Sequence, residues 1–205
     1  MSESLFSTPD DYMRMAFRMA LSRCGHTSPN PPVGALVVHD GKVVAQGGTQ
    51  RCGEDHAEVC ALRDAGDAAR GADMYVTLEP CSHWGRTPPC AEAIIRAGVR
   101  RVFIPVLDPD PRVSGGGVRM LTEAGIETIL LHSRRDQAID LLRPFLTGLT
   151  YHRSHLIHKY AMTIDGRTAP AAGRSWISSP VSRFGVHRLR GICDAVMVGK
   201  GTVLT

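Results

Sequence analysis

The chain has 205 residues, of which 43% are hydrophobic, 21% charged and 5% aromatic, and its formal net charge is +4. This length allows one large domain or two small ones, and no stretch comes near the roughly 20 apolar residues of a membrane-spanning helix, so we expect a globular protein without a membrane partner. The mild positive excess and the low aromatic content favour a small anionic substrate and argue against a nucleic-acid partner.

The chain opens with a polar segment that leads into a helix. Residues 1–9 lack a basic stretch followed by an apolar run, so we expect no secretory signal and a cytoplasmic location. Thr8 is a candidate N-cap, Pro9 stands at the first helical position, and apolar residues then recur at helical spacing. This pattern predicts a helix that ends near Arg23.

Helix and strand patterns then alternate up to residue 146. The apolar run 33–39, the turn Asp40-Gly41 and the run 42–47 predict a β-hairpin. Further helices are predicted at 56–65, 90–97, 117–124 and 134–146, and further strands at 73–78, 102–106 and 126–131. Strands joined through single helices indicate an α/β domain with a partly parallel sheet.

A polar, irregular stretch at 147–154 predicts a domain boundary, which gives a first domain at 1–150 and a second at 151–205. The second part carries predicted strands at 155–161 and 194–198 and a predicted helix at 181–190. About 55 residues form only one βαβ unit, which cannot bury its faces alone. We therefore expect the second domain to be incomplete in this chain.

Three segments of the first domain carry residues that bind metals. His56 and Glu58 stand at the start of one helix, Cys81 follows a strand, and Cys90 starts another helix. One imidazole and two thiolates are ligands that Zn²⁺ prefers, and three protein ligands leave a fourth position for water, as in catalytic sites. From the first turn of its helix Glu58 can reach the same centre, take a proton from that water and pass it to a leaving group.

The order of these residues is that of zinc nucleobase deaminases, whose signature is H-x-E followed by P-C-x-x-C. Here eight residues instead of two separate Cys81 from Cys90. The segment 77–90, TLEPCSHWGRTPPC, resembles the zinc loop of the bifunctional riboflavin-biosynthesis deaminase/reductase family. The segments at 30–34, 56–59, 159–169, 175–178 and 194–202 are also similar to that family, so the resemblance covers nearly the whole chain.

The resemblance implies a fold and an activity. The fold is a cytidine-deaminase-like three-layer α/β/α domain, followed by the truncated start of a dihydrofolate-reductase-like α/β domain. The activity is zinc-dependent deamination of 2,5-diamino-6-(5-phosphoribosylamino)pyrimidin-4-one, then NADPH-dependent reduction of the ribosyl group to ribityl in the full-length protein. The chain alone is not expected to carry out the reduction. The family often pairs or tetramerises, which suggests a homo-oligomer.

The resemblance also implies residue roles. In the deaminase part, the metal positions of the family fall on His56, Cys81 and Cys90, and the proton-transfer position falls on Glu58. The substrate positions fall on Asn30, His83 and Arg86. In the reductase part, the dinucleotide positions fall on Ala161, Trp176 and Thr202, and the substrate positions on Ser175 and Arg190. The family typically has Asn where this chain has Asp110, which leaves a loop contact open.

Several alternatives stay open at this point. Cys60, one helical turn after His56, could close a four-ligand structural site, with Glu58 then a solvated acid. His83 could be a zinc ligand or a surface residue, Arg86 a solvated charge, and Asn30 part of a simple turn. The glycines at 115–117 lack the ending of a phosphate loop and favour a flexible turn.

Two other functions compete with the deaminase of riboflavin biosynthesis. A tRNA or free-base deaminase would use the same scaffold, but it would favour a short gap between the cysteines and, for tRNA, a basic face. A non-catalytic zinc-stabilised binding module would hold the metal without an exchangeable water. Bound metal and ammonia release separate these functions.

Overall fold

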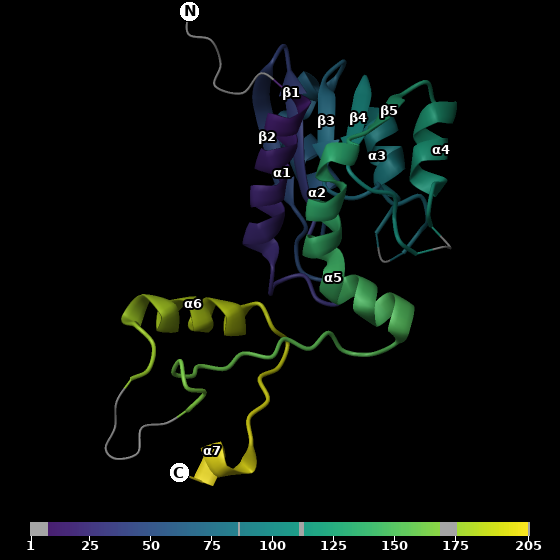
Figure 1. Ribbon diagram of the computed structural model, residues 1–205. Coiled ribbons are helices and arrows are strands. Elements are labelled where there is room, and N and C mark those ends of the chain that lie inside the picture. Colours follow the sequence, from purple (N-terminus) through teal and green to yellow (C-terminus); the bar gives the residue numbers. More distant parts are fainter. Residues whose placement is uncertain (1–7, 86, 111–112, 169–175, 205) are drawn as a thin grey trace, which may run out of the picture. The chain divides into compact units, whose positions relative to one another are not determined.

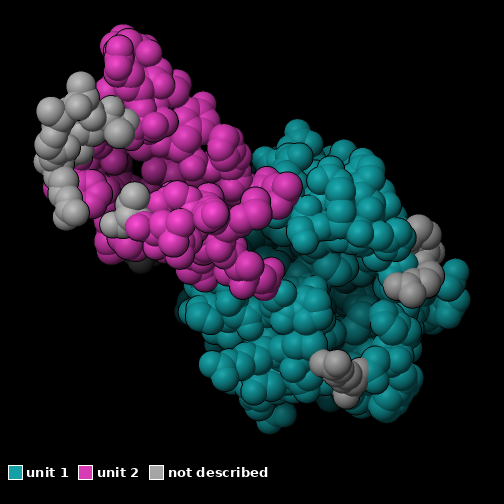
Figure 2. All heavy atoms as spheres, turned by 90° about the horizontal axis from the view of Figure 1, so that it is seen from below, with its two compact units in different colours: residues 1–155 teal, residues 156–205 magenta. Residues whose placement is uncertain are grey.

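The computed structural model describes residues 8–85, 87–110, 113–168 and 176–204. The chain divides into two compact units, residues 1–155 and 156–205 (Figure 2). The division lies five residues beyond the boundary predicted at 150, because the polar residues from Thr147 continue helix α5 (Arg135–Tyr151). Within that helix the Thr147 hydroxyl donates to the Arg143 carbonyl at 2.8 Å, which satisfies it without breaking the helix.

The first helix, α1 (Pro9–Arg23), begins as the sequence predicts. Thr8 is its N-cap, and the Thr8 hydroxyl oxygen accepts a hydrogen bond from the Asp11 amide at 3.3 Å. Pro9 occupies the first turn, where its missing N–H costs nothing. One face of the helix is buried, and it packs on the sheet through residues that include Met13 and Phe17.

Five strands form one mixed sheet in the order β2-β1-β3-β4-β5. They are β1 (Gly34–His39), β2 (Lys42–Gly48), β3 (Asp73–Val76), β4 (Arg101–Ile104) and β5 (Glu127–Leu130). β1 is antiparallel to β2 and β3, while β3, β4 and β5 are parallel. The predicted hairpin is confirmed: Asp40 and Gly41 both have positive φ, 49° and 70°, as a two-residue turn between twisted strands requires.

Helices cover both faces of the sheet, which gives three layers (Figure 1). The remaining helical elements of this unit are α2 (Ala57–Ala65), η1 (Gly66–Ala69), α3 (Cys90–Ala97), α4 (Gly116–Glu123) and η2 (His132–Arg134). Ala35 and Val37 of β1 pack toward α2 and α3, whereas Leu36 and Val38 pack toward α1. This alternation of side chains confirms the expected α/β/α architecture.

Two glycines of the hairpin let helices approach the sheet closely from its two faces. A Cβ on Gly34 would lie 2.1 Å from the Ala16 carbonyl oxygen of α1. A Cβ on Gly47 would lie 2.2 Å from the Ala57 carbonyl oxygen at the start of α2. The second contact fixes the N-terminus of α2, where His56 is the N-cap, against the sheet.

The described residues of the second unit form the helices α6 (Pro180–Gly191) and α7 (Lys200–Leu204). The helix predicted at 181–190 is confirmed. The strands predicted at 155–161 and 194–198 are wrong, because a strand is held by hydrogen bonds to a neighbouring strand and the described residues of this unit provide none. None of the helices in the described ranges has the length and apolar character to span a lipid bilayer.

Asp73 at the start of β3 is buried between two arginines. The Arg101 Nε–H donates to Asp73 Oδ1 at 2.9 Å, and Arg100 Nη2 donates to the same oxygen at 3.0 Å. Burial opposes ionisation of Asp73, but these hydrogen bonds outweigh it and hold the pKa of the carboxyl below its usual value. The interaction therefore stabilises the fold above the unfolded-state pKa of about 3.9 and is lost as the pH falls through the folded-state pKa.

We predict that Asp73→Asn lowers the free energy of unfolding by about 1.5–3 kcal/mol at pH 7, the usual size for hydrogen bonds to a charged group. The difference from the unsubstituted protein shrinks below pH 4. Urea unfolding at pH 7 and pH 3 measures both values. An equal difference at the two pH values would contradict the assignment.

Candidate metal centre

The candidate site lies at one edge of the sheet, where several loops meet. β3 and β4 end at this edge, and β1 starts there because it runs antiparallel to β3. The Gly34 amide donates to the Thr77 hydroxyl at 3.1 Å, and the Thr77 amide donates to the Gly34 carbonyl at 3.1 Å. The loop before β1 and the loop after β3 are thus joined side by side.

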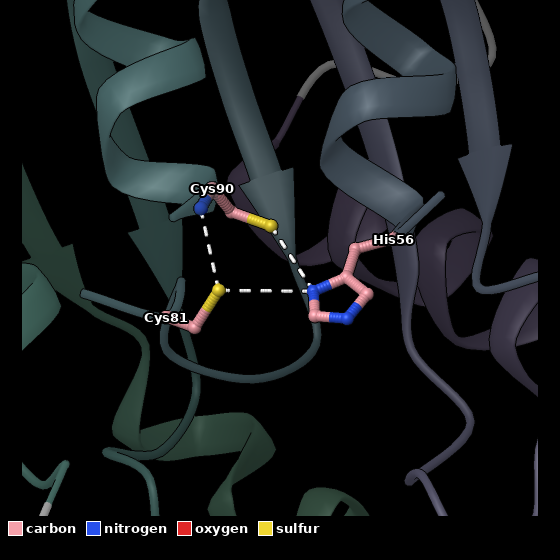
Figure 3. A group of neighbouring side chains, drawn as sticks. All are labelled: His56, Cys81 and Cys90. Atoms are coloured by element: carbon pink, nitrogen blue, oxygen red, sulfur yellow. Dashed lines mark hydrogen bonds between the residues drawn. The ribbon is translucent and has the colours of Figure 1, made fainter. Parts of the chain in front are cut away.

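Three metal-binding side chains converge at this edge (Figure 3). His56 comes from the N-cap of α2, Cys90 from the first position of α3, and Cys81 from the loop after β3. Their ligand atoms all lie within 4.8 Å of one another. The Nδ1 atom of His56 faces both sulfurs, at 3.2 Å from Cys90 Sγ and 3.7 Å from Cys81 Sγ.

These separations fit a tetrahedral zinc ion. An imidazole nitrogen about 2.0 Å and a thiolate about 2.3 Å from one Zn²⁺ lie roughly 3.5 Å apart at a tetrahedral angle. The two distances from His56 Nδ1 to sulfur, 3.2 and 3.7 Å, are on either side of that value. The residue types and their spacing are therefore those of a site with three protein ligands.

Hydrogen bonds stabilise the thiolate form of Cys81. The Cys90 amide donates to Cys81 Sγ at 3.2 Å, at the N-terminus of α3. Hydrogen bonds from the Cys90 thiol and from His56 lower the pKa of Cys81 to about 4, against the effect of burial. The same contact with Cys81, together with burial, raises the pKa of the Cys90 thiol. Two thiols this close favour a shared positive charge such as a metal ion.

Glu58 lies beside this group in the first turn of α2. Its residue is only 4% exposed, although acidic side chains are rarely buried without a partner. Burial and the charge of Cys81 raise the pKa of the Glu58 carboxyl to about 7, and a hydrogen bond links Glu58 to Cys90. The structure thus brings Glu58 and His56 to one centre, as their place at the helix start predicts.

Cys60 does not join the group. It is buried, and its sulfur accepts a hydrogen bond from Gln50 Nε2 at 3.6 Å. Its Cβ would lie 2.9 Å from a Cβ placed on Gly47, so Cys60 packs against β2. Among the described residues, the one group of three or more ligands is the one that combines His56, Cys81 and Cys90. The structure does not support a closed four-ligand site that includes Cys60.

The substrate residues expected in this unit are placed only in part. Asn30 is half-buried in a turn in which its amide donates to the Thr27 carbonyl at 2.9 Å. His83 is exposed in the loop between the two cysteines, outside the group of ligands, and interacts electrostatically with Asp108. Arg86 lies outside the described residues. The contacts of all three with substrate stay predictions.

The residues expected at the dinucleotide and reductase substrate lie in the second unit. Ala161 is half-buried, and Trp176 is exposed, with the Arg183 guanidinium 4.3 Å from its ring centroid. Arg190 of α6 and Thr202 of α7 are exposed. Ser175 falls outside the described part of the chain. Their roles also stay predictions.

Sequence reasoning gave no role to Glu79, two residues before Cys81. The residue is 3% exposed, and its carboxylate accepts three backbone hydrogen bonds. The amides of Asp108, Gly115 and Val118 donate at 2.8, 3.0 and 3.0 Å. The signal available in the sequence was an acidic residue directly after the strand predicted at 73–78.

Comparison with known proteins agrees with this geometry and defines the class. The family model of the cytidine and deoxycytidylate deaminase zinc-binding region matches residues 7–106, and that of the RibD C-terminal domain matches residues 154–205. Fold, site and family models together define a cytidine-deaminase-like zinc domain followed by the first part of a RibD C-terminal domain.

Over nearly its whole length the chain is similar to RibD riboflavin biosynthesis proteins. It is 48% identical to riboflavin biosynthesis protein RibD of Aquifex aeolicus over 95% of this chain and 54% of that protein, and 46% identical to RibD of Escherichia coli over 94% and 53%. A crystal structure of a diaminohydroxyphosphoribosylaminopyrimidine deaminase/5-amino-6-(5-phosphoribosylamino)uracil reductase from Thermotoga maritima matches with a TM-score of 0.86 and 43% identity, over 95% of this chain and 56% of that one. The chain spans about half the length of these relatives.

We predict that His56→Ala, Cys81→Ala and Cys90→Ala each weaken zinc binding by more than about tenfold, because each removes a ligand. Cys60→Ala should keep about one zinc per chain, since its sulfur lies outside the group. Elemental analysis after dialysis against a weak chelator measures the metal content. Zinc loss in Cys60→Ala equal to that in Cys81→Ala would support the closed site instead.

Proposed function

We propose that the first unit is a zinc-dependent deaminase that hydrolyses the amino group of 2,5-diamino-6-(5-phosphoribosylamino)pyrimidin-4-one. The observation that carries this proposal is the buried Glu58 carboxyl beside the His56, Cys81 and Cys90 group. A structural zinc site has no need of a buried acid next to its ligands. A hydrolytic site needs one to move protons.

The residues divide the chemistry between them. His56, Cys81 and Cys90 would hold the zinc ion, which supplies Lewis acidity and lowers the pKa of a coordinated water to near 7. Glu58 accepts the proton that the attacking water loses and donates it to the pyrimidine ring nitrogen. It then transfers the second proton of that water to the departing amine, so water and the aminopyrimidine give the carbonyl compound and ammonia.

The substrate assignment is supported by the similarity to RibD proteins and by the loops at the same edge of the sheet. The Thermotoga maritima relative is named for this deamination and for the reduction of the uracil product. Asn30 is on the loop before β1 and His83 on the loop after β3, which Gly34 and Thr77 join. We assign Asn30 to the pyrimidine, and His83 and Arg86 to the ring and the phosphate, with no nucleic acid involved.

For the second unit we propose a part in NADPH-dependent reduction in a protein that carries the whole RibD C-terminal domain. The match of residues 154–205 to that domain supports this proposal. Ala161, Trp176 and Thr202 would contact the dinucleotide, and Ser175 and Arg190 the substrate. We further propose a cytoplasmic homo-oligomer.

Glu58→Gln tests the mechanism. The amide cannot accept a proton, so we predict that ammonia release from the diaminopyrimidine phosphate falls by about 10²- to 10⁴-fold while zinc content stays unchanged. Glu92→Gln is a matched control, because Glu92 lies in the first turn of α3 but pairs with Arg96 at 3.4 Å. It should retain normal turnover. Near-normal turnover in Glu58→Gln would rule out the proton-transfer role.

The same ammonia assay separates the competing functions. We predict release from the diaminopyrimidine phosphate and none from tRNA, cytosine or guanine at equal concentration. Release from tRNA or a free base alone would favour the other deaminases. Bound zinc without release from any of these compounds would favour a binding module.

A further inference from the structure

A buried carboxylate joins the zinc loop to the segment that follows β4. Glu79 Oε2 accepts hydrogen bonds from the amides of Asp108 and Gly115, and Oε1 accepts one from the amide of Val118. Asp108 lies in the loop after β4 and Val118 lies in the first turn of α4. The Glu79 side chain therefore holds both the described part of that loop and the start of the helix. A carboxylate can accept from several N–H donors at once, which an amide side chain cannot match.

The start of α4 also packs directly on the zinc loop. A Cβ on Gly117 would lie 1.9 Å from the Pro80 carbonyl oxygen, and a Cβ on Gly116 would lie 2.5 Å from the Ser82 hydroxyl. The residues on either side of Cys81 are therefore in contact with the helix that Glu79 holds. The glycines, which resembled a flexible turn in the sequence, allow this close approach.

The Asp108 carboxyl of this segment interacts electrostatically with the candidate substrate residue His83. Burial raises the pKa of the Asp108 carboxyl, and the nearby His83 acts in the opposite direction. Asp108 Oδ1 also accepts a hydrogen bond from the Asp110 amide at 2.8 Å, which fixes the carboxyl within its turn. The position of the Asp108 carboxyl thus depends on where the backbone of Asp108 is held.

We infer that Glu79 is a positioning residue, which holds residues 108–110 and 113–118 against the zinc loop and so sets the substrate-binding edge around Asp108 and His83. The inference rests on the proposed deaminase function. Glu79 makes its three hydrogen bonds with backbone amides and stands outside the group of metal ligands. Its effect should therefore fall on substrate binding more than on the chemical step.

Glu79→Gln is the test, with Glu123→Gln on the exposed part of α4 as the control. In Glu79→Gln a side-chain NH₂ group replaces one of the two carboxylate oxygens, and an NH₂ group cannot accept a hydrogen bond from a backbone N–H. At least one of the three backbone donors therefore loses its partner. In the full 205-residue chain we expect faster hydrogen exchange at the amides of Asp108, Gly115 and Val118 by about tenfold or more, with exchange in β3 unchanged.

The kinetic readout separates positioning from chemistry. We expect KM for the diaminopyrimidine phosphate to rise about tenfold while kcat changes by less than about threefold and zinc content stays at the level of the control. Gly116→Ala, whose Cβ presses on the flexible Ser82 side chain, should raise KM without changing Glu79. It keeps the test valid if Glu79→Gln fails to fold.

Each outcome decides one claim. A wild-type chain that releases no ammonia contradicts the proposed function, and the amide-exchange comparison then decides whether Glu79 holds the segment. With an active wild type, unchanged exchange or unchanged KM in Glu79→Gln overturns the positioning role. Loss of zinc, or a fall in kcat as large as the rise in KM, also overturns it, because Glu79 would then act on the metal or the reaction.

Discussion

The site depends on two thiols and an imidazole that are forced together at the sheet edge where β3 ends. Close sulfur atoms would repel as thiolates, and the structure offsets this with positive partial charge from the N-terminus of α3, whose Cys90 amide donates to Cys81. His56 is brought to the same place because Gly47 lets the start of α2 rest on β2. The three side chains therefore come together because of the order of the strands, the glycine that admits α2, and the positions at which α2 and α3 begin.

Glu58 lies in an environment that suits the proposed proton transfer. A carboxyl in the first turn of α2 has no room to reach bulk water, so burial raises its pKa toward neutrality, where proton transfer in both directions is efficient. Cys60, two residues further along the same helix, packs against β2 and takes no part in the group. Two residues along a helix correspond to a rotation of roughly 200°, so Glu58 and Cys60 lie on nearly opposite sides of α2.

Most of the first unit could be predicted from local patterns, because its capping residues, its hairpin turn and its apolar periodicity agree with the final packing. The metal group could be predicted from residue types, since few other arrangements of His and Cys make chemical sense. Three features could not. The polar residues from Thr147 resemble a loop in the sequence, but the Thr147 hydroxyl bonds to the Arg143 carbonyl and α5 continues. The strands expected at 155–161 and 194–198 need a neighbouring strand, which their own sequence pattern does not reveal. Glu79 accepts hydrogen bonds from amides that are 29 to 39 residues away in the sequence.

The turn Asp40-Gly41 lies at the edge of the sheet opposite to the metal group, as does the end of α3 at Gly98. Among the described residues, no backbone–backbone hydrogen bond runs from either turn to the loops that carry His56, Cys81 or Cys90. Residues at this far edge can drift during evolution, or accept an inserted tag, at a cost in folding alone. The proposed catalytic site and these tolerant turns therefore lie at opposite ends of the same sheet.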